Sequence, residues 1–219
     1  EVDFPASAEM SAMARKIYHQ VFDHEENITL DPDKEIVSWT EMEYNLFRKL
    51  EFDRYGDIIA RGFTTVDQFI EVANMVLNRR KSRAGKSLEH HLSAIFDGNR
   101  LPYESQPRTE GNKRPDFIFP GGDSYHDTAW PSDKLVFLGA KTTCKDRWRQ
   151  IINEANRIEV KHLFTLQQGI SAQQLDEMSA EKVILVVPRV YLDSYPKEKR
   201  DSIWTLKKFI SFVKEKTGG

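Results

Sequence analysis

Two apolar runs near the middle of the sequence, each bordered by a charged residue, place the strongest constraint on the fold. Asp116 precedes the run Phe117-Ile118-Phe119, and Lys141 follows the run from Leu135 to Ala140. Runs of this length that are rich in β-branched and aromatic residues are typical of strands buried on both faces. We therefore predict two buried strands, each with a charged side chain at one end.

The charged residues beside these strands suggest a metal site. An isolated charge at the end of a buried strand is costly to desolvate, so Asp116 and Lys141 could simply pair with each other. A helix predicted over residues 146–160 would bring a second carboxylate, Glu154, to the same place. Two carboxylates at a sheet edge suit Mg²⁺, which binds oxygen ligands together with water and phosphate. Such a metal would polarise a phosphate and activate water, with Lys141 orienting that water or offsetting developing negative charge.

The same stretch resembles the PD-(D/E)xK nucleases, and most closely the catalytic domain of the EcoRII-type restriction endonucleases. The resemblance is carried by Arg114-Pro115-Asp116, by Asn153-Glu154, and by the string Lys-Thr-Thr-Cys-Lys-Asp-Arg-Trp-Arg-Gln-Ile over residues 141–151. In the common form of the motif an acidic residue stands two positions before the lysine, where this chain has Gly139. The match is therefore to the permuted form, in which Glu154 supplies the acid.

The resemblance implies an α/β fold with a mixed central β-sheet flanked by helices. It implies a catalytic set of Glu89, Asp116, Lys141 and Glu154, with Asp116 and Glu154 binding Mg²⁺. Glu89 matches a glutamate that the EcoRII-like group supplies from an upstream helix; the alternative is an ordinary surface residue.

By the same resemblance, the expected activity is that of a type II restriction endonuclease on double-stranded DNA. The target would be of the CCNGG type, expected CCWGG, cut ahead of the outer cytosine with the central base pair flipped out. Bases that leave the stack are commonly held by aromatic side chains. Trp39 and Tyr125 are the candidates for that pocket, and core packing is the alternative for Trp39.

Lys145, Asp146 and Arg147 are the candidates for reading the outer base pairs. Arginine binds guanine through O6 and N7, and aspartate accepts a hydrogen bond from cytosine N4, so Asp146 and Arg147 together suit a C·G pair. The alternative is a capping aspartate at a helix start, with Arg147 as its partner.

A basic run follows a predicted helix over residues 65–77. We assign Arg80, Lys81 and Arg83 to the DNA backbone, although a charge run is usually a solvated helix face. Gly85 and Ser87 predict the start of a new helix, whose backbone N–H groups would favour phosphate.

Composition sets the remaining expectations. The 219 residues carry a net charge of −2 and one cysteine, which excludes a disulfide within the chain and suggests a reducing compartment. No apolar run could span a bilayer. We expect a bacterial or archaeal cytoplasmic protein, without membrane contact. A homodimer is expected as well, because two strands must be cut. Because the chain begins at Glu1 rather than Met, we expect a fragment or a processed form, which leaves room for a further N-terminal regulatory domain.

The remaining elements complete the expected architecture. We expect residues 1–30 to form an N-terminal helical segment and residues 31–219 to form the catalytic domain. Strands over residues 162–166 and 183–187, joined by a helix, predict a parallel pair. Further helices are predicted over residues 8–22, 38–53, 171–180 and 202–214.

Two other functions remain open at this stage. A DNA-binding module with a silent nuclease site would bind DNA equally with or without Mg²⁺. A structure-specific repair nuclease would keep the catalytic residues but would not need Asp146 and Arg147.

Overall fold

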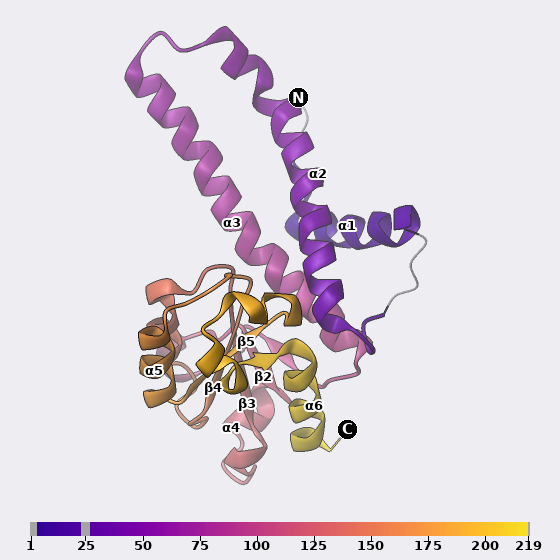
Figure 1. Cartoon of the computed structure of the whole chain (residues 1–219), viewed down its shortest axis with the longest axis vertical. Helices are drawn as coiled ribbons and strands as arrows, with labels where there is room; N and C mark the ends of the chain where they lie inside the picture. Colours follow the sequence, from indigo (N-terminus) through magenta and orange to yellow (C-terminus); the bar gives the residue numbers. More distant parts are fainter. Residues whose placement is uncertain (1–3, 23–26, 219) are drawn as a thin grey trace. The chain divides into compact units, whose positions relative to one another are not determined.

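The computed structural model describes residues 4–22 and 27–218, apart from the side chain of residue 146. Within it the chain forms two compact units, which we describe separately (Figure 1). The first contains the N-terminal helix and residues 38–91, and the second contains residues 27–37 and the chain from residue 92 onward. This division differs from the boundary expected after residue 30.

Long helices build the first unit. Helix α1 is Ser7–Phe22, and most of α2 (Pro32–Arg61) and of α3 (Val66–Gly98) also belongs here. Helices α2 and α3 form a hairpin, and the Thr65 hydroxyl accepts a hydrogen bond from the Gln68 N–H at the start of α3. The prediction that a new helix begins near Ser87 is wrong, because α3 runs without a break through Gly85. A single glycine costs a helix about 1 kcal/mol, which a helix of this length tolerates.

A six-stranded mixed sheet forms the centre of the second unit. Strands β1, β2 and β3 are antiparallel, and β3 to β6 are parallel to one another. Their order in the sheet follows the sequence. The expected mixed sheet and the parallel pair of β4 with β5 are therefore confirmed. The strands are β1 Glu104–Ser105, β2 Phe117–Phe119, β3 Val136–Lys141, β4 Lys161–Thr165, β5 Val183–Val187 and β6 Trp204–Thr205.

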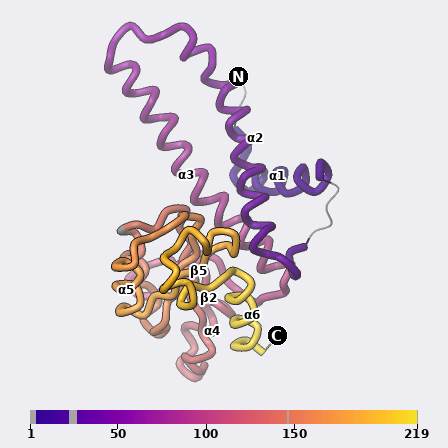
Figure 2. The backbone as a smooth tube through the Cα atoms, in the orientation of Figure 1, coloured from indigo at the N-terminus to yellow at the C-terminus, as the bar shows by residue number. Residues whose placement is uncertain are grey.

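Helices cover both faces of this sheet (Figure 2). Successive strand residues point to opposite faces, so each face has its own core. Leu175 and Met178 of α5 (Ala172–Ala180) belong to the same buried cluster as Ile118, on one face. On the other face Phe209 of α6 (Leu206–Thr217) and Phe96 contact the ring of Phe119.

Short helical segments make up most of the remaining connections. They are α4 Gly122–His126 and the 3-10 segments η1 Glu110–Asn112, η2 Ser132–Lys134, η3 Lys145–Ile151, η4 Arg189–Ser194 and η5 Lys197–Ser202.

The prediction of a helix over residues 146–160 is wrong. The chain instead forms η3 and then a series of turns, with a left-handed backbone at Ala155 (φ 51°). Arg147, Gln150 and Glu154 therefore do not share one helical face.

Residues 27–37 are held in the second unit by a buried carboxylate. Asp33 accepts backbone N–H groups of Arg189, Leu206 and Lys207, at 3.1, 2.8 and 3.0 Å. The last two lie in the first turn of α6, where backbone N–H groups have no partner within the helix. Asp33 thus satisfies the start of α6 from a distant part of the sequence.

Candidate active site

Asp116 and Lys141 meet at the point where β2 begins and β3 ends. One carboxylate oxygen of Asp116, Oδ2, accepts hydrogen bonds from the Lys141 ammonium at 2.8 Å and the Ala140 N–H at 2.7 Å. The antiparallel register of the two strands places Asp116 beside this end of β3. The other oxygen, Oδ1, has no hydrogen-bond donor among the residues that the structure describes. The predicted pair therefore forms and still leaves a carboxylate oxygen for a ligand.

Gly139 explains why this site has no acid two residues before the lysine. A Cβ atom at Gly139 would lie 3.0 Å from Cγ2 of Ile151 and 3.4 Å from Cδ1 of Leu163. Ile151 is fully buried in the core at this place. The space that an acidic side chain would need is thus filled by an isoleucine from η3.

Glu154 lies in the turn that follows Ile151, and it reaches the same site. Its carboxyl lies close enough to Lys141 and Asp116 for both charges to affect its pKa. Burial raises the pKa of Glu154, and the negative charge of Asp116 raises it further while Lys141 opposes the shift. The structure thus brings together three of the residues predicted from the sequence.

The turn that carries Glu154 is held by side chains from distant parts of the sequence. The Lys113 ammonium donates to the carbonyl oxygen of Asn153 at 2.7 Å. The Lys161 ammonium donates to the carbonyls of Ala155, at 2.6 Å, and Ile158. Glu110 accepts the backbone N–H of Asn156 at 3.3 Å. These contacts fix the backbone on both sides of Glu154.

Lys161 was not among the predicted site residues. It is 3% exposed, and burial lowers the pKa of its ammonium to about 8, with Glu110 and Glu154 opposing the shift. The only sequence signal was a lysine at the start of an apolar strand, the same signal that marked Asp116 and Lys141. Lys113 and Glu110 lie in a polar connection and gave no such signal.

The donors at this site fit a divalent metal. Burial and the negative charge of Asp116 raise the pKa of Glu154, so a cation between the two carboxylates would stabilise the charged form of Glu154. Hard carboxylate oxygens suit Mg²⁺. No group of three His, Cys, Asp or Glu side chains forms a metal cluster within the described part of the chain. Water and phosphate oxygens would therefore have to complete the coordination of an ion held by Asp116 and Glu154.

The predicted base-reading segment forms η3, directly after the site. Lys145 and Arg147 are exposed, whereas Trp148 is buried against the core, so the segment presents its basic side chains outward. The side chain of Asp146 lies outside the described residues. Cys144, at the start of η3, is fully buried, and burial raises the pKa of its thiol to about 11. A buried, protonated thiol agrees with a packing role.

Trp39 belongs to a buried cluster within the first unit. It is 0% exposed, and its ring lies against the rings of His19 and His91 and under the guanidinium of Arg15. His91 in turn lies 3.0 Å from the buried carboxylate of Glu43. An indole enclosed in this way has no face open to a nucleobase, so the structure favours the packing alternative.

Tyr125 is also enclosed, within the second unit. It is 2% exposed, its hydroxyl donates to Glu110, and the backbone N–H of Arg157 approaches the same oxygen at 3.4 Å. The guanidinium of Arg157 binds the carbonyls of Tyr125, Asp127 and Trp130, the last two at 2.9 and 2.8 Å. These contacts give Tyr125 a structural role beside the Glu154 turn.

The basic run lies in the middle of α3, in the first unit. Arg80 forms a two-point ion pair with Glu51, and Arg83 donates to the carbonyl of Pro5 and lies over Phe47. Lys81 is exposed. Glu89 lies further along the same helix and is half-buried. The continuous helix offers no N-terminus near Gly85 for a phosphate, so that part of the prediction is wrong.

Comparison with known proteins places these features in a family. Residues 47–210 match the family model described as EcoRII C terminal. The chain is 50% identical over 184 residues to the type II restriction enzyme EcoRII of Escherichia coli. This match covers 84% of the chain and 46% of that enzyme. The chain thus spans less than half the length of this relative.

Solved structures share the fold at low sequence identity. A complex of metal-depleted Ecl18kI with uncleaved DNA matches 98% of this chain and 80% of its own, with a TM-score of 0.80 and 20% identity. A complex of the restriction endonuclease PspGI with substrate DNA matches 98% and 94%, with a TM-score of 0.77 and 14% identity. The fold is that of these restriction endonucleases. Since the family model spans most of the sequence and both units, the chain belongs to the EcoRII C-terminal family.

Proposed function

We propose that the chain is the catalytic domain of a type II restriction endonuclease that cuts double-stranded DNA. The proposed target is a CCNGG-type site, expected CCWGG, and the proposed cofactor is Mg²⁺. The observation that carries the proposal is the meeting of Asp116, Lys141 and Glu154 at one end of β3. Membership of the EcoRII C-terminal family and the likeness to two DNA-bound endonucleases support it.

Each residue of the site has a part in phosphodiester hydrolysis. Asp116 and Glu154 would hold the metal, and a bound Mg²⁺ supplies positive charge beside the phosphate and lowers the pKa of an attacking water. Lys141 would stabilise the negative charge that develops on the phosphate. The hydrogen bonds of Asp116 orient Lys141 and hold the end of β3 in place. Glu89 is proposed as a further acid from α3.

DNA recognition is proposed for two basic segments. Lys145, Asp146 and Arg147 would read the outer C·G pairs, and the exposure of Lys145 and Arg147 supports this role. Of the three residues assigned to the DNA backbone, Lys81 is exposed, whereas Arg80 and Arg83 would have to share the contacts that they make in this structure. Flipping of the central pair remains part of the proposal, but its pocket is not placed at Trp39 or Tyr125, whose rings are buried.

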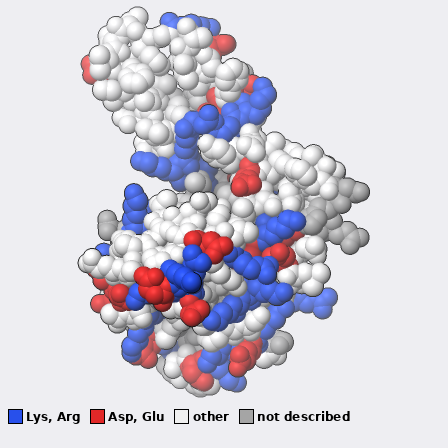
Figure 3. All heavy atoms as spheres, in the orientation of Figure 1, with Lys and Arg blue, Asp and Glu red and all other residues white. Residues whose placement is uncertain are grey.

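A homodimer is proposed because one active site cuts one strand. The α2–α3 hairpin offers a surface for this contact, since it exposes apolar side chains that a monomer would normally bury. Few charged atoms lie at the end of the hairpin (Figure 3). The exposed apolar residues near it are Phe52, Ile58, Ile59, Val66, Phe69 and Ile70.

The first test is cleavage with Mg²⁺ of duplexes that contain CCAGG, CCCGG or neither sequence. The wild type is compared with Lys141→Ala and with Lys134→Ala, a matched change at an exposed lysine in η2. We expect the wild type and Lys134→Ala to cut only CCNGG-type duplexes. Lys141→Ala should lose cleavage while it still binds DNA, because the group that stabilises the phosphate charge is gone.

The other outcomes separate the alternatives. DNA binding that is tight with or without Mg²⁺, and no cleavage of any duplex, would favour a silent nuclease site. Equal cutting of all three duplexes would keep the nuclease and remove the sequence specificity. Cutting of CCAGG but not CCCGG would support an A·T central pair.

A further inference from the structure

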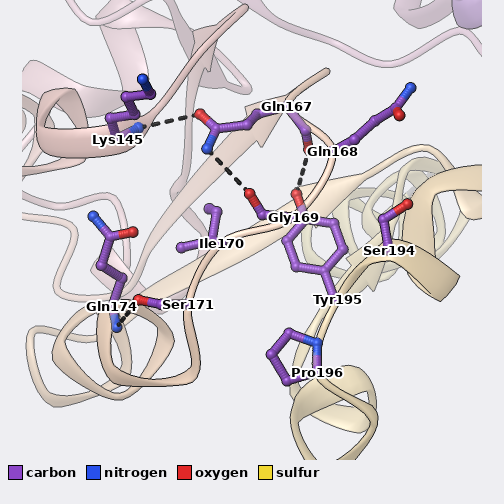
Figure 4. A pocket seen from close by; sticks show the side chains of 10 residues that line it. All are labelled: Lys145, Gln167, Gln168, Gly169, Ile170, Ser171, Gln174, Ser194, Tyr195 and Pro196. Carbon is purple, nitrogen blue, oxygen red and sulfur yellow. Dashed lines mark hydrogen bonds between the residues drawn. The ribbon is translucent and has the colours of Figure 1, made fainter.

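Gln167 connects the end of the central sheet to the start of the base-reading segment. It lies two residues after β4, and its side-chain oxygen accepts the backbone N–H groups of Cys144 at 2.9 Å and Lys145 at 3.3 Å. Its side-chain NH₂ donates to the carbonyl of Gly169 at 3.1 Å. Figure 4 shows the amide directed toward Lys145, with the neighbouring Gln168 directed away.

The main chain of Gln167 is fixed as well. The hydroxyl of the buried Tyr195 donates to the Gln167 carbonyl at 2.5 Å, and the Gln167 N–H donates to the Thr165 hydroxyl at 3.2 Å. The side chain therefore reaches toward η3 from a backbone that is itself held at two points. An amide oxygen in this position is a fixed acceptor rather than a mobile surface group.

The segment that Gln167 contacts lacks a capping side chain of its own. The first backbone N–H groups of a helical segment have no partner within the helix and are usually satisfied by a side chain at its start. Cys144 occupies that place in η3 and makes no such hydrogen bond. Gln167, 22 and 23 residues away in the sequence, supplies the missing acceptor. The direction in which Lys145 and Arg147 leave the sheet thus depends on a residue outside the segment.

We propose that Gln167 is a positioning residue for base recognition, which sets the orientation of the Lys145–Arg147 segment without contacting DNA itself. This inference rests on the proposed restriction activity. Hydrogen-bond recognition of a base edge depends on both distance and angle, so a segment that can rotate should bind correct and incorrect base pairs more equally. The loss should therefore appear in discrimination between sites more than in cleavage as such.

The test measures kcat/KM on the CCNGG duplex that the wild type cuts best and on a duplex with one outer C·G pair changed to T·A. Gln167→Leu removes both the acceptor and the donor at similar size. Gln167→Glu keeps an acceptor for Cys144 and Lys145 and removes the donor to Gly169. Gln168→Leu is the matched control, since Gln168 is an exposed neighbour of the same type. We expect Gln167→Leu to lower the ratio of the two values by about tenfold or more, Gln167→Glu to recover most of it, and Gln168→Leu to leave it unchanged.

Other results would overturn the inference. A folded Gln167→Leu with the wild-type ratio, or with equal losses on both duplexes, would leave Gln167 a merely structural residue. If Gln167→Leu does not fold, Tyr195→Phe decides, because it removes the donor to the Gln167 carbonyl and should lower the same ratio; an unchanged ratio would end the proposal. A wild type that cuts no duplex would overturn the proposed function, and this inference with it.

Discussion

Gly139 shows how a single position can decide which residue would carry the acid of the proposed active site. The absence of a side chain there lets Ile151 pack against β3, and in the proposed site the acid would be supplied by Glu154, three residues after Ile151. The sequence predicted Asp116 and Lys141 from charges beside apolar runs. It predicted Glu154 from a helix that does not form, and the family resemblance pointed to the same residue. It could not identify Lys161, Lys113 or Gln167 as supports, because their partners lie between 3 and 40 residues away in the sequence and are mostly backbone atoms.

Glu154→Gln tests the acid directly. A neutral amide is a weaker metal ligand than a carboxylate, and losing several kcal/mol of charge stabilisation corresponds to a loss of at least about a hundredfold in cleavage rate. The Mg²⁺ concentration needed for half-maximal cleavage should also rise. Both quantities come from a Mg²⁺ titration of the cleavage rate.

The double variant Gly139→Asp with Glu154→Gln tests whether an acid at residue 139, two positions before Lys141, can replace Glu154. We expect no recovery, because the new Cβ would lie 3.0 Å from Ile151 in a packed core. Overpacking of this kind costs roughly 1–3 kcal/mol of stability, which a thermal melt of Gly139→Asp would record. Recovered cleavage in the double variant would contradict this account of Gly139.

At the scale of elements, local pattern predicted the strands well and the segment after Lys145 poorly. The apolar runs at β2, β3, β4 and β5 are buried on both faces, so their composition alone indicates strands. Residues 146–160 have the apolar spacing of a helix, yet they form η3 and turns. The turns are held by Lys113, Glu110 and Lys161, and such tertiary contacts override local preference. The prediction for α3 was wrong in the opposite direction, because it divided one helix into two. Gly85, which suggested a break, lies within a continuous helix.

His162 in β4 gives the contact between sheet and α6 a dependence on pH. Its ring packs against Trp204, Phe209 and Phe212, and burial lowers its pKa from 6.5 to about 4. His162 is therefore protonated below about pH 6.5 in the unfolded chain, but only below about pH 4 in the folded chain. Folding stability should fall as the pH falls through this range, by about 3 kcal/mol at most.

The measurement is urea unfolding at pH 7 and pH 4.5. His162→Phe should lose less stability between the two than the wild type, because it has no proton to take up. His126→Gln, a change at an exposed histidine, should behave as the wild type does. An equal loss in His162→Phe would assign the acid sensitivity to other groups.

At the scale of the whole molecule, the proposed activity requires two active sites, one for each DNA strand. No helix in the described ranges is both long and apolar enough to cross a membrane. The α2–α3 hairpin exposes a group of apolar side chains, and such patches are typical of protein interfaces. In the proposed homodimer a second copy of the chain would cover them and supply the second active site.

Ile59→Lys with Phe69→Lys tests this surface. Ile59 is 61% and Phe69 is 53% exposed, so charges there should leave the fold intact. We expect the variant to be monomeric by light scattering and to nick a supercoiled plasmid rather than linearise it. Val190→Lys, a matched change at an exposed apolar residue of η4, should remain dimeric and make both cuts. A double variant that stays dimeric would move the interface elsewhere.

Each of the two compact units is built from two separate stretches of the sequence. Residues 27–37 belong to the second unit but lie between two pieces of the first, and Asp33 links them to α6. The later boundary, between His91 and Leu92, falls inside the uninterrupted helix α3. No single cut in the gene can therefore separate one complete unit from the other. An exchange of parts between relatives would have to transfer residues 27–37 together with the chain from residue 92, or the recipient would lose the carboxylate that begins its last helix.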